Sequence, residues 1–294
     1  MKNIQEFGID VWKGLLREIG AEYQIILQPV LKNNSVKLLC LCVKNVKSNM
    51  GVDIYLEEYY EDYKRGREIT DIIKKIAGDC EVQCPKKEME FSYFLTWSNV
   101  KNRVMYKLVN YEMNRKLLEN VPHVKYLDLA IVFYYSLETD GSGMATIQIN
   151  NYHMRLWKIG IDELLNMAKE NTPKLLGALV EPLDKIVEDL LCVGEIMMED
   201  MLPPMYIMTN NTKLMGAATM LYPEALKTFA EEKKCDFHIL PSSIHEILLI
   251  PADGSCDEEW DEIIKVVNDT VLDKCEVLSD HAYYYSRATN EVTM

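Results

Sequence analysis

Apolar residues at the start of the chain follow two different periods. Residues 3–19 carry one every three or four positions, which predicts an amphipathic helix that ends at Gly20. Residues 23–30 and 35–43 are extended apolar runs, and Lys32-Asn33-Asn34 between them suits a hairpin turn. We therefore expect a helix followed by a β-hairpin.

The next segment carries a stripe of tyrosines. Tyr55, Tyr59 and Tyr63 recur every four positions, which predicts one face of a helix. We expect these side chains to be half-buried against the hairpin; the alternative is an aromatic and acidic surface that binds a basic peptide. A second helix is predicted over residues 68–77, with Gly78 at its end.

The middle of the chain combines a predicted helix with a predicted hairpin. Residues 101–120 place apolar side chains at helical intervals. Residues 126–137 are strongly strand-like, and residues 144–150 follow as their partner after a glycine-containing turn. Thr172 and Pro173 suit the cap and the first position of a helix, and residues 184–191 are expected to form another.

Short extended runs alternate with helices in the rest of the chain. The predicted strands are residues 205–209, 237–240, 247–250 and 278–287, and the predicted helices are residues 223–232 and 260–272. The small residues Gly216, Ala217 and Ala218 allow another backbone to approach closely.

These elements predict an α+β fold, in which antiparallel β-hairpins or a sheet are covered by helices in two or three lobes. Strands occur in adjacent pairs without sustained β-helix-β alternation, which argues against a doubly wound parallel sheet. Polar stretches within the chain mark two boundaries. The expected domains are residues 1–84, 85–196 and 197–294.

The negative charge of the chain disfavours some classes of binding partner. The 294 residues carry a formal net charge of −14, and so acidic a surface repels phosphate backbones and anionic lipid. We therefore expect neither a nucleic-acid nor a membrane partner. The beginning of the chain lacks the apolar core of a signal peptide, and no apolar run approaches the ~18 residues that span a bilayer, so a cytoplasmic location is expected.

The eight cysteines are expected to be reduced and mostly buried. Cys40 and Cys42 alternate along an extended run, so they should share a face, which we expect to point into the core. The sequence has no C-x-x-C pair, no finger-type histidine spacing and no glycine-rich nucleotide motif. It therefore predicts no metal and no cofactor.

The strongest candidate chemistry lies in residues 240–246, Leu-Pro-Ser-Ser-Ile-His-Glu. One interpretation is nucleophilic catalysis, in which Ser242 or Ser243 attacks, His245 takes its proton, and a carboxylate such as Glu246 orients the imidazole. The other is structural, because Ser243 and Glu246 have the spacing of a capping box, whose side chains satisfy free amides at the start of a helical turn. Neighbouring residues seldom form a linear serine–histidine hydrogen bond, and no G-x-S-x-G elbow is present, so we expect the structural role.

Two further interpretations remain open. His245, Glu246, Asp280 and His281 would converge on a metal if the last extended run paired beside residues 247–250, although no ligand spacing fixes them. A methionine cluster suits either core filling, the commoner use, or a flexible surface for partner helices. Its members are Met197, Met198, Met201, Met205 and Met208.

Several segments resemble one known family. They are RVMYKLVNYEMNRKLL, LDLAIVFYYSL, GAATMLYP, LPSSIHEILLIP and LSDHAYYYSR. The chain resembles, over nearly its whole length, a family of uncharacterised proteins from gut Clostridia (Firmicutes) that is catalogued as a domain of unknown function. The resemblance implies a bacterial cytoplasmic origin, and it brings no activity and no catalytic residues.

We expect a non-catalytic binding or regulatory protein that acts through a macromolecular partner, a protein rather than a nucleic acid. The alternative is a hydrolase that uses Ser243 or Ser242 with His245. The hydrolase requires a serine oxygen and a histidine nitrogen facing each other within ~3.2 Å in an open cleft. The sequence leaves the identity of the partner and the oligomeric state open.

Overall fold

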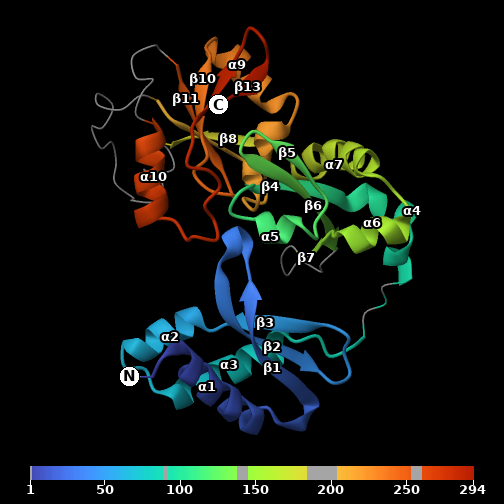
Figure 1. Ribbon diagram of the computed structural model, residues 1–294, viewed down its shortest axis with the longest axis vertical. Helices are drawn as coiled ribbons and strands as arrows, with labels where there is room; N and C mark the ends of the chain where they lie inside the picture. The colour runs from blue at the N-terminus through green and yellow to red at the C-terminus, as the bar shows by residue number, and fades with distance from the viewer. Residues whose placement is uncertain (1, 89, 91, 138–144, 184–203, 253–259) are drawn as a thin grey trace. The chain divides into compact units, whose positions relative to one another are not determined.

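The computed structural model describes residues 2–88, 90, 92–137, 145–183, 204–252 and 260–294. The chain divides into two compact units, Met1–Ser92 and Tyr93–Met294. Every strand pairing among the described residues is antiparallel, and the strands form three sheets (Figure 1). The predicted α+β class is confirmed, whereas the division into three domains stays a prediction.

A helix-covered sheet builds the N-terminal unit. Its strands are β1 (Tyr23–Leu31), β2 (Lys37–Asn45) and β3 (Gly51–Tyr55), in that order. Its helices are α1 (Ile4–Glu18), α2 (Glu57–Lys64) and α3 (Ile69–Gln83), with short turns η1 (Gly20–Glu22) and η2 (Asn33–Ser35). Leu39, Leu41 and Val43 on one face of β2 share a buried cluster with residues of α1 and α3.

Local sequence signals explain most of this unit. The first helix is confirmed, and it starts at a capping box formed by Asn3 and Glu6. The first hairpin is also confirmed, and its turn holds Asn34 at a φ of 57°, a left-handed conformation that asparagine tolerates. Two predictions are wrong: α3 continues past Gly78 to Gln83, because its buried face extends to Cys80, and Tyr55 ends strand β3 instead of starting a helix.

Two sheets organise the C-terminal unit. In the smaller one, β6 (Leu129–Leu137) pairs with β4 (Val104–Asn110), β5 (His123–Tyr126) and β7 (Ala145–Gln148). The larger sheet has the order β13-β12-β10-β11-β9-β8. Its strands are β8 (Leu179–Pro182), β9 (Tyr206–Thr209), β10 (Phe237–Leu240), β11 (Ile247–Pro251), β12 (Tyr283–Ser286) and β13 (Glu291–Thr293). The pairing of β6 with β7 confirms the second predicted hairpin.

Helices and short turns connect these strands. They are η3 (Ser92–Leu95), α4 (Trp97–Val100), η4 (Lys101–Arg103), α5 (Arg115–Leu118), α6 (Asn151–Trp157), α7 (Ile161–Leu176), η5 (Gly216–Leu221), α9 (Ala225–Lys233) and α10 (Trp260–Thr270). The helices predicted over residues 223–232 and 260–272 correspond to α9 and α10. The helix predicted over residues 184–191 lies outside the described residues. No described helix combines the length and the apolar character needed to cross a membrane.

The helix predicted over residues 101–120 is wrong, because its first half is strand β4. Six of the seven β4 residues are buried, so the strand shows no alternation of apolar and polar positions. Side chains of α7 bind its outer edge. Thr172 Oγ1 accepts the N–H of Tyr106 at 3.1 Å, and the Asn171 amide donates to the Val104 carbonyl at 2.9 Å.

The same contacts explain a second wrong prediction. Thr172 and Pro173 do not start a helix, because α7 runs through both residues to Leu176. The Thr172 hydroxyl donates to the Ala168 carbonyl at 2.6 Å, inside the helix. The missing N–H of Pro173 falls in the last helical turn, where the loss of one hydrogen bond is tolerated more easily than in the middle.

Asp128 ties the last part of the chain to the smaller sheet. Its carboxylate accepts hydrogen bonds from the Ser279 hydroxyl at 2.6 Å and the Tyr283 hydroxyl at 2.7 Å. Tyr283 opens β12, which pairs with β10. These bonds join segments more than 150 residues apart in the sequence and connect the start of β12 to the smaller sheet.

Candidate functional site

Residues 241–246, which hold the predicted site, form the loop of a β-hairpin in the larger sheet. Strand β10 ends at Leu240 and β11 begins at Ile247, with Leu240 opposite Leu248. The loop contains bends and no helical turn. The predicted capping of a helical turn is therefore wrong, although the serine and the glutamate do interact.

Ser243 is buried, with 2% of its surface exposed, and its hydroxyl is engaged on both sides. Its Oγ accepts the N–H of His245 at 2.9 Å and donates to the Glu246 carboxylate at 2.7 Å. Its own N–H donates to the Glu246 carbonyl at 3.2 Å. Ser243 therefore stabilises the loop through hydrogen bonds to residues of the same loop. The neighbouring Ser242 is partly exposed.

The His245 ring contacts other segments instead of the serines. Its Nδ1 accepts the N–H of Met215 at 3.2 Å, and its Nε2 lies 3.6 Å from the Glu276 carboxylate. Because Nδ1 accepts, the proton of the neutral ring resides on Nε2, toward Glu276. Within the described part of the chain, no hydrogen bond joins a serine hydroxyl to this ring. The geometry supports the structural role, and catalysis by Ser242, Ser243, His245 and Glu246 stays a prediction.

The loop also packs closely against η5. The Thr209 hydroxyl donates to the His245 carbonyl at 2.7 Å, and the Ala217 N–H donates to the Ile244 carbonyl at 3.3 Å. A Cβ at Gly216 would lie 2.0 Å from Thr209 Oγ1 and 2.4 Å from the His245 carbonyl oxygen. The predicted close approach at Gly216 is therefore present, and only glycine fits there.

The residues of the alternative metal site do not come together. The last extended run pairs beside β10 and not beside β11, so the condition for convergence fails. His281 bonds Asp261 instead, at 2.9 Å through Nδ1, and the Asp280 carboxylate accepts from the Asn268 amide at 2.8 Å. His245 faces Glu276.

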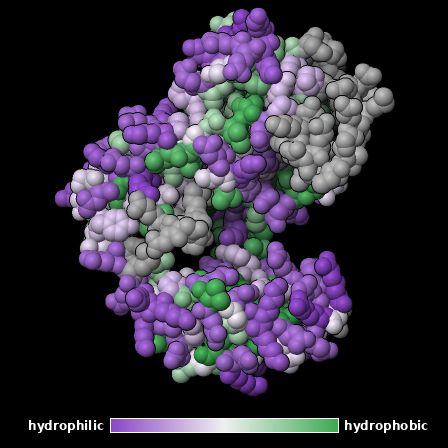
Figure 2. All heavy atoms as spheres, turned by 180° about the vertical axis from the view of Figure 1, so that it is seen from behind, coloured by the Kyte–Doolittle hydropathy of each residue, from purple (hydrophilic) through white to green (hydrophobic). Residues whose placement is uncertain are grey.

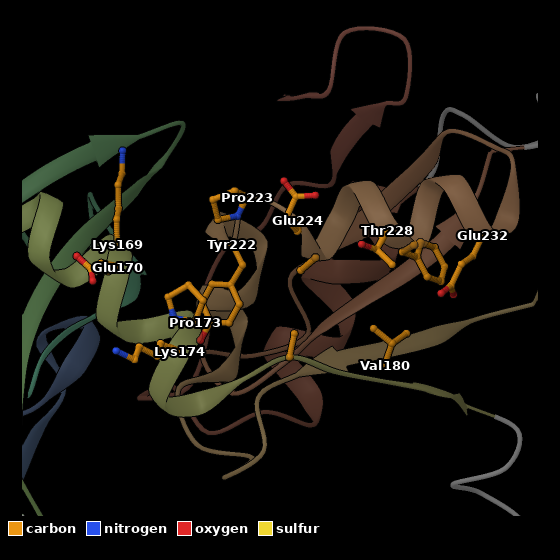
Figure 3. A pocket seen from close by; sticks show the side chains of 13 residues that line it. Lys169, Glu170, Pro173, Lys174, Val180, Tyr222, Pro223, Glu224, Thr228 and Glu232 are labelled. Carbon is orange, nitrogen blue, oxygen red and sulfur yellow. The ribbon is translucent and has the colours of Figure 1, made fainter.

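A groove with a volume of about 710 Å³ lies elsewhere in the C-terminal unit, and we call it the α7–α9 groove (Figure 3). One wall is the end of α7 with the start of β8, and the other is residues 222–224, which follow η5, with α9. Its lining is Lys169, Glu170, Pro173, Lys174, Ala178, Val180, Tyr222, Pro223, Glu224, Ala225, Thr228, Phe229 and Glu232. The volume falls in the range of ligand pockets.

The floor of the groove is apolar and its rims are charged. Ala225 and Phe229 are four residues apart on α9 and are half-buried and buried, whereas Thr228 and Glu232 of the same lining are exposed. Opposite them, α7 contributes exposed lysines beside Glu170. Figure 3 shows the α7 and α9 side chains projecting from opposite walls, with Tyr222 between them.

Tyr222 brings a buried polar atom to this groove. Its hydroxyl has no hydrogen-bond partner among the described residues, and the same holds for Tyr106 and Tyr134. The rings of Tyr106 and Tyr222 meet edge to face with centroids 6.2 Å apart. Burial raises the pKa of Tyr222, so its hydroxyl stays neutral and able to donate or accept. A buried hydroxyl without a partner costs about 1–3 kcal/mol, and because this oxygen is closed to solvent, a ligand in the groove meets the ring of Tyr222 and not its hydroxyl.

A second hollow of about 540 Å³ shares Lys169, Tyr222, Pro223 and Glu224 with the groove. It extends toward Tyr285 and the β13 strand. The two hollows meet at Tyr222 and Pro223, which gives a partner more surface than the groove alone.

Neither hollow was identified from the sequence. The inward placement of Ala225 and Phe229 on one helix was predicted, but not the wall that faces them. Among the clustered methionines, Met197, Met198 and Met201 lie outside the described residues, and Met208 is buried. Hydrophilic side chains cover most of the face in Figure 2, as the charge of −14 leads one to expect, with smaller hydrophobic patches between them.

Comparison with known proteins gives one match. A family model described as a family of unknown function (DUF5688) matches residues 4–287. This confirms the resemblance to a family of unknown function over nearly the whole chain. No curated protein and no solved structure matches the chain.

Proposed function

We propose that this chain, which belongs to the family of unknown function DUF5688, is a non-catalytic protein that binds a short segment of another protein in the α7–α9 groove. The observation that carries the proposal is the groove itself, with its apolar lining and its charged rims. An occupant that fits has an apolar side chain that packs against Ala225, Phe229 and the ring of Tyr222.

The charge of the α9 wall specifies the occupant further. Both ionisable residues that α9 and its cap contribute, Glu224 and Glu232, are acidic. Glu224 pairs with Lys227 at 3.8 Å, whereas Glu232 has no ion pair among the described residues. A partner segment with a lysine or arginine beside its apolar residue would pair with Glu232. The net charge of −14 would also accelerate encounter with such a segment.

The hydrogen bonds of the 241–246 loop support a binding protein over the hydrolase alternative. The Ser243 hydroxyl donates to Glu246, and the His245 ring accepts from Met215. A nucleophile would have to lose the first of these bonds, and its base the second, before they reach each other. The groove needs no such rearrangement.

The test uses a displayed library of random short peptides, selected for binding to the full chain. We expect the selected peptides to carry an apolar residue next to lysine or arginine. Thr228→Trp fills the groove and Glu232→Lys reverses its rim charge, so each should weaken binding at least ~10-fold, which is about 1.4 kcal/mol. The matched controls are Glu231→Trp and Glu231→Lys, at a neighbouring exposed position of α9 that does not line the groove.

Two outcomes would contradict the proposal. One is that the selected peptides bind Thr228→Trp as tightly as the unsubstituted chain. The other is that Glu231→Lys weakens binding as much as Glu232→Lys, since the effect would then come from overall charge and not from the groove.

A further inference from the structure

Two thiols of the N-terminal unit lie side by side on the sheet. Cys40 and Cys42 alternate along β2, and their sulfurs are 3.8 Å apart, so the prediction that they share a face is confirmed. The prediction that this face points into the core is wrong for Cys42, which is partly exposed, although Cys40 is buried. This face is opposite to the one whose leucines and valine, Leu39, Leu41 and Val43, pack with the helices. The pair is thus separate from the apolar cluster between sheet and helices.

A carboxylate completes the cluster. Asp53 on β3 is the register partner of Cys42, and its oxygen and the two sulfurs all lie within 4.8 Å of one another. Gln28 on β1 is the register partner of Cys40, and its amide donates to Cys42 Sγ at 3.2 Å. Three neighbouring strands therefore direct sulfur and oxygen atoms to one point, and the hydrogen bonds of the sheet hold them in register.

We infer that Cys40, Cys42 and Asp53 bind a thiolate-preferring divalent cation of the zinc and cadmium class. Thiolates select such metals, and a carboxylate oxygen is an accepted third ligand for zinc. Two Zn–S bonds of ~2.3 Å at the tetrahedral angle place the sulfurs ~3.8 Å apart. The two thiols already have this separation, so binding requires little movement of the strand.

The surroundings leave the site accessible. Cys40 is buried, but Cys42 is partly exposed and Asp53 is exposed, so a cation reaches the cluster from the side of β3. Three protein ligands leave the fourth tetrahedral position to the exposed Gln28 side chain or to water. Among the described residues, no other set of histidine, cysteine and acidic side chains gathers in this way. The inferred site differs from the expectation from the sequence that no metal binds, and it depends on the register of β2 and β3, which no local pattern predicts.

The test is a titration of the reduced full chain with Cd²⁺ alone, followed by the ultraviolet absorption of cadmium–thiolate bonds. We expect one tight equivalent per chain that Zn²⁺ displaces. Cys40→Ser and Cys42→Ser should each weaken binding at least ~10-fold, and Asp53→Asn by roughly 10-fold. The control variants Cys235→Ser and Cys275→Ser replace partly exposed thiols outside the cluster, and they should leave this equivalent intact.

Cadmium NMR of the bound ion adds a readout that does not depend on the folding of a cysteine variant, since its chemical shift reports the number of thiolate ligands. A shift typical of two thiolates supports the site. The inference is overturned if the unsubstituted chain binds no Cd²⁺ tightly or if Cys40→Ser and Cys42→Ser bind like the controls. Unchanged affinity in Asp53→Asn, an exposed position where folding is checked by circular dichroism, also overturns the three-ligand assignment.

Discussion

Ser243→Ala is the substitution that separates a structural loop from a catalytic one. It removes the acceptor of the His245 N–H and the donor to the Glu246 carboxylate. Because Ser243 is 2% exposed, water cannot replace these partners without opening the loop. A buried donor left without a partner costs about 1–3 kcal/mol, so we expect a loss of about 2 kcal/mol in the free energy of unfolding.

Thermal unfolding of the full chain measures this loss. For a unit the size of Tyr93–Met294, 1 kcal/mol shifts Tm by ~2–4 °C, so Ser243→Ala should lower the Tm of that unit by about 4–8 °C. The matched control is Ser242→Ala, at the partly exposed neighbouring serine, which should lower Tm by less than ~1 °C. Equal Tm values for the two variants would refute the structural reasoning. An unchanged or raised Tm for Ser243→Ala is the behaviour of a strained nucleophile and would favour the hydrolase.

Three further predictions concern stability. Gly216→Ala should destabilise the protein by more than ~3 kcal/mol in urea unfolding, since its Cβ would lie 2.0 Å from Thr209 Oγ1, and a loss below ~1 kcal/mol would contradict this packing. Gly78→Ala should stabilise α3 by about 0.5–1 kcal/mol, because the glycine lies inside the helix and nothing lies within 4 Å of the added Cβ. A lower Tm for this variant would show that the helix does not continue there. Burial lowers the pKa of His153 below 6.5 in the folded protein, so this residue contributes stability above pH 6.5, and that stability is lost as the pH falls through the folded pKa. His153→Gln should therefore make Tm fall less steeply as the pH is lowered. An unchanged slope of Tm against pH would contradict this prediction.

Hairpins were the elements that the sequence predicted best. Residues 23–30 and 35–43 form β1 and β2, and residues 144–150 include β7, because alternation and turn residues are local signals. The sequence pattern over β4 predicts a helix, because a strand buried on both faces loses its alternation of apolar and polar residues. Its outer edge is bound by Thr172 and Asn171, more than 60 residues away, and no local pattern reveals such a partner.

In the candidate site, too, the sequence predicts contacts between near neighbours but not contacts between distant segments. The closeness of Ser243 and Glu246 is a matter of local spacing, and the structure places them in contact. The orientation of His245 toward Glu276 depends on a segment about 30 residues later in the chain, and it was not predictable. The α7–α9 groove joins residues 169–180 with residues 222–232, so it exists only once the tertiary structure has formed.

The long-range bonds of Asp128 have a consequence during synthesis. Ser279 and Tyr283 leave the ribosome 151 and 155 residues after Asp128. At ~5–20 residues per second, the two donors are synthesised roughly 8–30 s after this carboxylate. During that interval β9, β10 and β11 can pair, while the edge of β10 that later receives β12 stays open. A nascent chain at this stage exposes an unpaired strand edge, which is the surface that chaperones protect from aggregation.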